Sequence, residues 1–194
     1  SIGLLHAFRK RGLSVGYTKP LGQRVQKTGE HALHEDTLLV SRSLGMREDQ
    51  QSDLAVPLTK SKIGQDTQDA EVQESLAGIR RSYETAAKGR DLVVVEGAGH
   101  VAVGSCLKVS AAEAACAVNA RVLLISGGGI GSTIDSLSLS WDFLRYRGAD
   151  VMGVVVNKIW PQKFAHITEA VRRGLSSLDI RCFGTVPYEE RLSQ

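Results

Sequence analysis

One acidic residue of this 194-residue chain stands directly after a run of apolar residues. In "DLVVVEGAGH" (91–100), Glu96 follows four apolar residues and precedes Gly97 and Gly99. An uninterrupted apolar run is typical of a strand that is buried on both faces of a parallel sheet. Because open α/β sheets bind ligands at the carboxyl ends of their strands, we expect Glu96 to hold a cation or to accept a proton there. The alternative is that the amides of its own glycine turn satisfy the carboxylate.

Two further charged residues occupy comparable positions. Lys19 ends another predicted strand, and the following Pro20 keeps it out of helical geometry, so its ammonium group suits a phosphate or a carboxylate ligand. Asp36 lies in the first turn of a predicted helix, where an acid can simply complement the helix dipole. His31 and His34 are spaced like a pair of metal ligands, but the sequence offers no matching third ligand.

Two segments raise the possibility of a nucleotide. Asn157 ends the apolar run "GVVVNK" (153–158), and its amide presents the donor and acceptor that the edge of adenine requires. Asparagine also tolerates the left-handed turn that often follows a strand, so both interpretations stay open. The glycine-rich "SGGGIG" (126–131) links a strand to a helix but does not have the GxGxxG spacing, so it does not by itself indicate a dinucleotide site.

Buried strands alternate with amphipathic helices along the whole chain. We expect helices over 1–12, 34–45, 69–89, 110–118, 136–148 and 164–175, and strands over 13–22, 53–59, 92–95, 121–126, 151–157 and 179–187. This order predicts an α/β fold with a three-layer, doubly wound, mostly parallel sheet. The polar segments 47–53 and 60–69 are predicted loops, either lids or plain surface.

Composition excludes several classes of function. The formal net charge is +3 and aromatic residues make up 5%, which gives little for nucleic acid to bind. No apolar run approaches the roughly 18 residues of a membrane span, so we expect no membrane partner. Cys106, Cys116 and Cys182 have no paired spacing, which favours a reducing cytoplasm over a disulfide scaffold. We expect a single domain over residues 1–194.

Six short segments in this order resemble the dethiobiotin synthetase family of P-loop enzymes. They look closest to the branch that forms the N-terminal domain of phosphate acetyltransferases and of proteins with a DRTGG domain. The segments are "GYTKPLGQ" (16–23), "HEDTLL" (34–39), "VVVEGAGH" (93–100), "VLLISGGGIGSTID" (122–135), "GVVVNK" (153–158) and "GTVPYEERLSQ" (184–194). The similarity therefore covers nearly the whole chain.

The resemblance implies a P-loop fold that uses ATP and Mg²⁺. By position it implies Asp36 and Glu96 as the metal ligands, Lys19 and Glu96 as the catalytic residues, Gly97 and Gly99 as the turn that admits phosphate or substrate, and Asn157, Val186 and Pro187 as the adenine site. Family members carry a Walker A loop, GxxxxGK[ST], ahead of these segments, so the resemblance implies that the loop would stand upstream of Ser1.

Two departures from the family pattern count more against dethiobiotin synthesis than against ATP binding. Leu21, Gly22 and Gln23 stand where dethiobiotin synthetase has small residues and a substrate-binding serine. His100 replaces the last glycine of the Gly-Ala-Gly-Gly turn, which narrows the room for a substrate carboxylate.

The expected function is a Mg-ATP-binding domain, either an ATPase or an enzyme that activates a carboxylate or a carbamate. The alternatives are a true dethiobiotin synthetase, a regulatory module that senses nucleotide without turnover, and a fragment that folds but binds nothing. The resemblance also implies a homodimer, a small-molecule substrate and an attached C-terminal domain.

Overall fold

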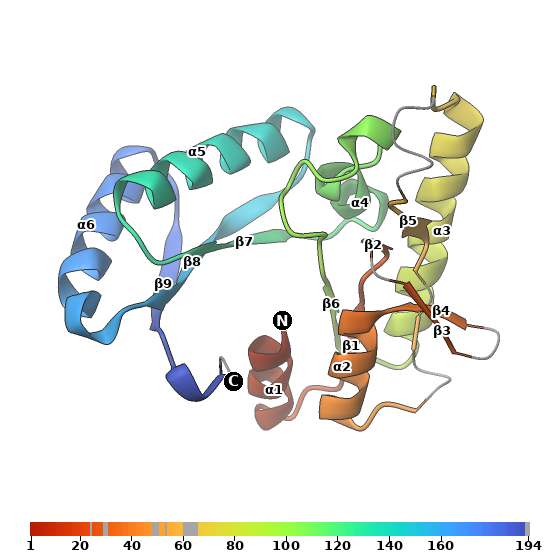
Figure 1. Cartoon of the computed structure of the whole chain (residues 1–194), viewed down its shortest axis with the longest axis horizontal. Coiled ribbons are helices and arrows are strands. Elements are labelled where there is room, and N and C mark those ends of the chain that lie inside the picture. The colour runs from red at the N-terminus through yellow and green to blue at the C-terminus, as the bar shows by residue number, and fades with distance from the viewer. Residues whose placement is uncertain (24, 29–30, 48–50, 53, 60–65, 193–194) are drawn as a thin grey trace. The chain divides into compact units, whose positions relative to one another are not determined.

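The computed structural model describes residues 1–23, 25–28, 31–47, 51–52, 54–59 and 66–192 (Figure 1). The chain forms two compact units, Ser1–Ala120 (unit 1) and Arg121–Gln194 (unit 2). Helices alternate with mostly parallel strands, as predicted for the α/β class. The predicted loops 47–53 and 60–69 lie partly outside the described residues. None of the described helices is both long enough and apolar enough to cross a lipid bilayer.

Over its described residues, unit 1 consists of short strands and α-helices. Its helices are α1 (Ile2–Lys10), α2 (Glu35–Leu44), α3 (Asp69–Ala87) and α4 (Ala111–Ala117), with a 3-10 turn at Ser105–Leu107. Its strands are β1 (Val15–Thr18), β2 (Leu21–Gly22), β3 (Val25–Thr28), β4 (His31–His34), β5 (Val56–Pro57) and β6 (Leu92–Val95). The predicted helices over 1–12, 34–45, 69–89 and 110–118 are confirmed to within two residues at each end.

Helices cover both faces of β1, which makes unit 1 three layers deep. Tyr17 on one face packs in a core cluster with Leu5 of α1 and Val40 of α2. On the other face, the backbone of Gly16 lies so close to α3 that an added Cβ would stand 2.1 Å from the carbonyl oxygen of Ala86. The alternation of side chains along β1 therefore sends one set of residues to α1 and α2 and the other to α3.

The predicted strand over 13–22 is interrupted at Lys19 and Pro20. β1 pairs in parallel with β6, whereas β2, after the proline, pairs in parallel with β5. The next pair, β3 with β4, is an antiparallel hairpin that the sequence did not predict. Its four-residue strands carry few apolar residues, so they lack the alternating pattern that identifies a half-buried strand.

The apolar run of β6 was expected to be buried on both faces of a sheet, and this prediction is wrong. All four residues, Leu92 to Val95, are only partly buried. β6 pairs with β1 along one edge, and among the described residues no strand is hydrogen-bonded to its other edge.

Unit 2 contains a parallel three-stranded sheet in the order β7-β8-β9. Its elements are β7 (Val122–Gly127), α5 (Gly131–Tyr146), β8 (Val151–Ile159), α6 (Phe164–Ser177) and β9 (Cys182–Pro187), with 3-10 turns at Pro161–Lys163 and Glu190–Leu192. The two helices contact each other and the same sheet (Figure 1). α5 begins five residues before the predicted start, directly after the glycine-rich turn.

Candidate functional site

The two acidic residues predicted to hold a cation both contact Lys19. The Lys19 ammonium group donates to Oδ2 of Asp36 and, at 2.9 Å, to Oε1 of Glu96. The side chain of Lys19 is only 9% exposed, whereas the side chains of Asp36 and Glu96 are 42% and 25% exposed. The three side chains thus form a charged cluster with its cation inside and its acids nearer to solvent.

The parallel pairing of β1 with β6 explains why Lys19 and Glu96 meet. Thr18 and Val95 are aligned in register, so the two residues that follow leave the sheet side by side at its carboxyl edge. The amide of Glu96 extends the ladder by donating to the carbonyl oxygen of Thr18 at 2.8 Å. Asp36 comes from a third element, the first turn of α2.

The opposite charges of the cluster shift the pKa values of its buried members. Burial alone would lower the pKa of Lys19, but its hydrogen bonds to Asp36 and Glu96 outweigh burial and raise the pKa above its ordinary value. Lys19 therefore stays protonated at neutral pH. The buried phenol of Tyr17 has its pKa raised by burial first and then by the negative charges of Glu96 and Asp36, so it stays neutral beside them.

Tyr17 is a neighbour of the cluster that the sequence analysis missed. It stands two residues before Lys19 and is fully buried. Since side chains two apart in a strand point to the same face, this spacing was the signal that could have identified it.

His34, one of the two histidines spaced like metal ligands, also adjoins the cluster, whereas the side chain of His31 lies outside the described part of the chain. His34 is the N-cap of α2, and its Nδ1 accepts the backbone N–H of Asp36 at 3.1 Å. Burial first, and then the charge of Lys19, lower the pKa of His34, so its neutral form is favoured. Among the described residues, no three side chains of His, Cys, Asp or Glu are grouped as metal ligands.

A cation at this cluster would therefore take few ligands from the protein. Mg²⁺ is commonly held by one or two carboxylates and completes its shell with waters and substrate phosphates. Asp36 and Glu96 fit this pattern, because both already contact one cation, the ammonium group of Lys19. The donor set suits a magnesium ion that arrives with a phosphorylated ligand.

Of the two glycines in the turn after Glu96, only Gly99 has a backbone conformation that favours glycine. Gly99 has a φ of +68°, which a side chain disfavours, and an added Cβ would meet nothing within 4 Å. Gly97 has no such φ, and an added Cβ would stand at an ordinary 3.8 Å from Ala111. The exposed His100 turns back on its own loop, where its Nδ1 accepts the amide of Ala102 at 3.2 Å.

The predicted adenine residues all belong to unit 2. Asn157 lies near the end of β8, and its Oδ1 accepts the backbone N–H of Lys158 at 2.8 Å. Lys158 has a φ of +58°, and the pairing of β8 with β9 shifts register between Val156 and Ile159, so this contact stabilises an irregularity within the strand. Val186 and Pro187 end β9, with Val186 44% exposed. Because these residues lie in the other unit, their convergence with Lys19, Asp36 and Glu96 stays a prediction.

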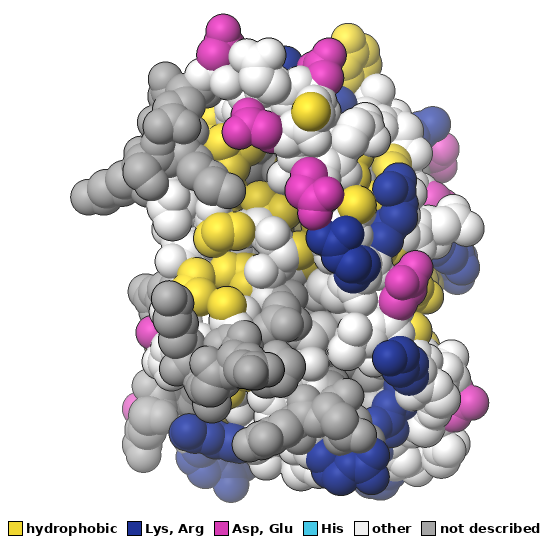
Figure 2. Space-filling view, turned by 90° about the vertical axis from the view of Figure 1, so that its right-hand side faces the viewer, with side chains coloured by type: hydrophobic (Ala, Val, Ile, Leu, Met, Phe, Trp, Pro, Cys, Tyr) yellow, Lys and Arg dark blue, Asp and Glu magenta, His cyan; other side chains and the backbone are white. Residues whose placement is uncertain are grey.

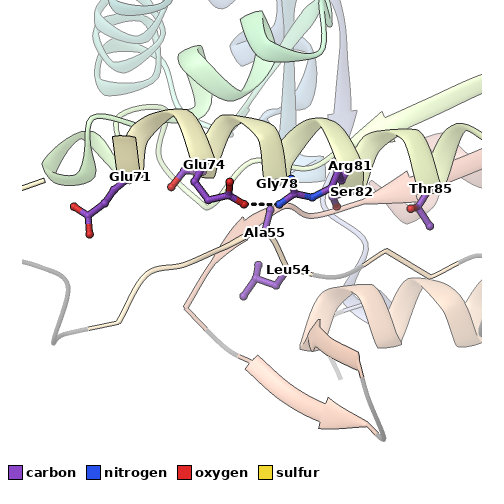
Figure 3. A pocket seen from close by; sticks show the side chains of 9 residues that line it. Leu54, Ala55, Glu71, Glu74, Gly78, Arg81, Ser82 and Thr85 are labelled. Carbon is purple, nitrogen blue, oxygen red and sulfur yellow. Dashed lines mark hydrogen bonds and ion pairs between the residues drawn. The ribbon is translucent and has the colours of Figure 1, made fainter. Parts of the chain in front are cut away.

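A hollow of about 550 Å³ lies between α3 and the segment before β5 (Figure 3). Leu54 and Ala55 form one wall, and on the other an ion pair of 2.7 Å joins Glu74 to Arg81 across Gly78. Both charged side chains are more than half exposed, and exposed pairs contribute little. Figure 2, a view onto this side of unit 1, shows acidic side chains above and basic ones below, so neither charge dominates. The hollow lacks the buried charge of the Lys19 cluster.

Known proteins match the chain over its length. A family profile described as an AAA domain (AAA_26) matches residues 1–194. The chain is 28% identical over 205 residues to a phosphate acetyltransferase of Pseudomonas putida, covering 100% of the chain and 28% of that protein. It is 29% identical over 152 residues to the ATP-dependent dethiobiotin synthetase BioD of Methanococcus vannielii, covering 78% of the chain and 68% of that protein.

A solved structure shares the fold. The MinD cell division protein of Aquifex aeolicus superposes with a TM-score of 0.58 at 15% sequence identity, over 99% of this chain and 77% of that one. At this sequence identity the similarity shows only that the fold is shared, and it confirms the predicted α/β class. The chain spans only 28% of the phosphate acetyltransferase that it matches.

Proposed function

Because the chain belongs to the AAA domain family and is a dethiobiotin synthetase-like P-loop NTPase, we propose that it binds ATP together with Mg²⁺. The reaction class we propose transfers the terminal phosphoryl group of ATP to a carboxylate or carbamate oxygen and leaves ADP. One observation carries the proposal: the carboxyl edge of β1 and β6 presents a buried ammonium group in contact with two carboxylates.

Each residue of the cluster has a role in this proposal. Asp36 and Glu96 would hold Mg²⁺, and bound Mg²⁺ would neutralise part of the charge of the phosphates. Lys19 would turn from the carboxylates to the terminal phosphate, where a fixed positive charge stabilises the transferring group. Gly97 and Gly99, which carry no side chains, would let a phosphate or substrate approach this turn.

Calorimetric titration with ATP, in the presence of Mg²⁺ or of EDTA, tests the proposal. The titration uses the full natural protein. We expect binding that Mg²⁺ strengthens and that Lys19→Ala weakens. Absence of ATP binding under both conditions would refute the proposal.

Glu96→Gln separates an enzyme from a sensor of nucleotide. The substitution keeps the size of the side chain but removes a charge that would hold Mg²⁺. An enzyme would lose turnover, which we expect to fall at least about 100-fold, since one electrostatic contact in a transition state is worth roughly 10²–10³ in rate. A sensor would have negligible turnover before the change and would lose only its Mg²⁺-dependent affinity.

The similarity to BioD supports one second candidate, a true dethiobiotin synthetase. That enzyme would close a cyclic urea from a diamino acid, CO₂ and ATP. ATP hydrolysis would then depend strictly on the diamino acid. Binding of ATP without any stimulation by the diamino acid would remove this candidate and leave the broader proposal in place.

A further inference from the structure

His34 lies where the hairpin ends and α2 begins, next to the Lys19 cluster. Its backbone is extended, with φ −74° and ψ 146°, and its side chain caps the helix by accepting the N–H of Asp36. A helix N-cap satisfies one of the amides that the first turn leaves without a partner. The imidazole of His34 therefore stabilises the turn that carries the carboxylate of Asp36.

The imidazole rests against the backbone of Gly22. A Cβ added at position 22 would stand 2.3 Å from Cδ2 and 2.7 Å from Nε2 of His34. Real Cβ atoms do not approach other atoms so closely, so any side chain at position 22 would displace the ring. His34 is 6% exposed, which leaves the displaced ring little free space in which to settle.

The position of Asp36 follows from these two contacts. His34 Nδ1 lies 3.4 Å from Asp36 Oδ2, the same oxygen that accepts from Lys19. The ring and the ammonium group thus both border the same carboxylate oxygen of Asp36. Loss of the ring would free both the helix end and the side of the carboxylate that the ring now limits.

We propose that His34 is a positioning residue. Its contact with the backbone of Gly22 fixes the imidazole ring, and the ring in turn keeps Asp36 facing Lys19 and Glu96. This inference rests on the proposed function, in which Asp36 holds a divalent cation. Residues that orient metal ligands typically change metal affinity by about 10- to 100-fold when they are replaced.

Four variants test the proposal by Mn²⁺ binding in the presence of ATP, measured by electron paramagnetic resonance. We expect His34→Ala and Gly22→Ala each to lower Mn²⁺ affinity about tenfold or more, the first by removing the ring and the second by displacing it. His34→Asn should retain affinity within about threefold, because asparagine is a good N-cap. Gly22→Ala combined with His34→Asn should match His34→Asn alone, since the shorter side chain leaves room for the methyl group.

Hydrogen exchange of the Asp36 amide separates failure of this inference from failure of the proposed function. If the natural protein binds no Mn²⁺ with ATP, the proposed function fails, and the metal part of the inference fails with it. If it binds Mn²⁺ and His34→Ala binds equally well with equal protection of the amide, the positioning role alone is refuted. Circular dichroism confirms that each variant folds, and the double variant keeps the test decisive should Gly22→Ala unfold.

Discussion

At the scale of single residues, the cluster places one cation against two acids. A buried charge is costly unless it is paired, and removal of one partner leaves the others uncompensated. Here Lys19 is the buried member, while Asp36 and Glu96 remain partly exposed. The ammonium group thus contacts the same two carboxylates that we assign to the metal.

Lys19→Ala should therefore destabilise the protein and make it depend on metal. Without the ammonium group the two carboxylates repel each other, and we expect a loss of about 1–3 kcal/mol of unfolding free energy, or about 2–10 °C in melting temperature. Addition of Mg²⁺ should restore more of the melting temperature in this variant than in the unmodified protein. Lys10→Ala, at an exposed position of α1, is the control and should change little. An equal effect of Mg²⁺ on both proteins would contradict the expectation.

At the scale of elements, the site depends on how closely α3 approaches β1. The helix lies against Gly16, and Ser82 of α3 is hydrogen-bonded through its hydroxyl to Thr18 at 2.6 Å. Thr18 precedes Lys19, so the helix and the strand together set where the lysine leaves the sheet.

Gly16→Ala should move β1 away from α3. The new methyl group would overlap backbone atoms, which cannot rotate aside, and overpacking of this kind costs roughly 1–3 kcal/mol or more. Gly3→Ala is the matched control, because an added Cβ there meets nothing within 4 Å and alanine favours the helix. Thermal denaturation followed by circular dichroism should show a lower melting temperature for Gly16→Ala and an equal or higher one for Gly3→Ala. Equal melting temperatures would show that the contact is not tight.

At the scale of the whole molecule, the nucleotide proposal draws on both units. Unit 1 carries the charged cluster, and unit 2 carries Asn157, Val186 and Pro187. The convergence of these residues on one nucleotide stays a prediction. The homodimer expected from the family resemblance also stays a prediction at this scale, open to light scattering.

Asn157→Asp tests the adenine role and can keep the contact with the backbone of Lys158. Aspartate keeps an oxygen that can accept the N–H of Lys158 but loses the amide donor that adenine would need. We expect the preference for ATP over GTP, measured by calorimetry, to fall about tenfold, since a good bidentate contact with a base contributes roughly 1–3 kcal/mol. An unchanged preference would restrict Asn157 to its structural role.

The predictable part of the fold followed from local patterns. The helices of unit 1 were identified to within two residues, because a 3.6-residue periodicity reflects burial of one helix face. The start of α5 was missed by five residues, and the predicted strands 13–22 and 53–59 were too long. The hairpin of β3 and β4 was not identified, because its short strands carry little apolar signal. The limited burial of β6 was also missed, since an apolar run does not reveal how many partners a strand has.

For the candidate site, the sequence by itself determined that Lys19 and Glu96 each stand at the carboxyl end of a strand, where open α/β sheets bind their ligands. That the two strands are neighbours was decided by the tertiary structure. Only the tertiary structure decided that the Lys19 ammonium group reaches both acids and that His34 lies on Gly22. These contacts join residues from separate elements. Their distances depend on strand register and on the hairpin that returns the chain to α2, and no local pattern of residues encodes those distances.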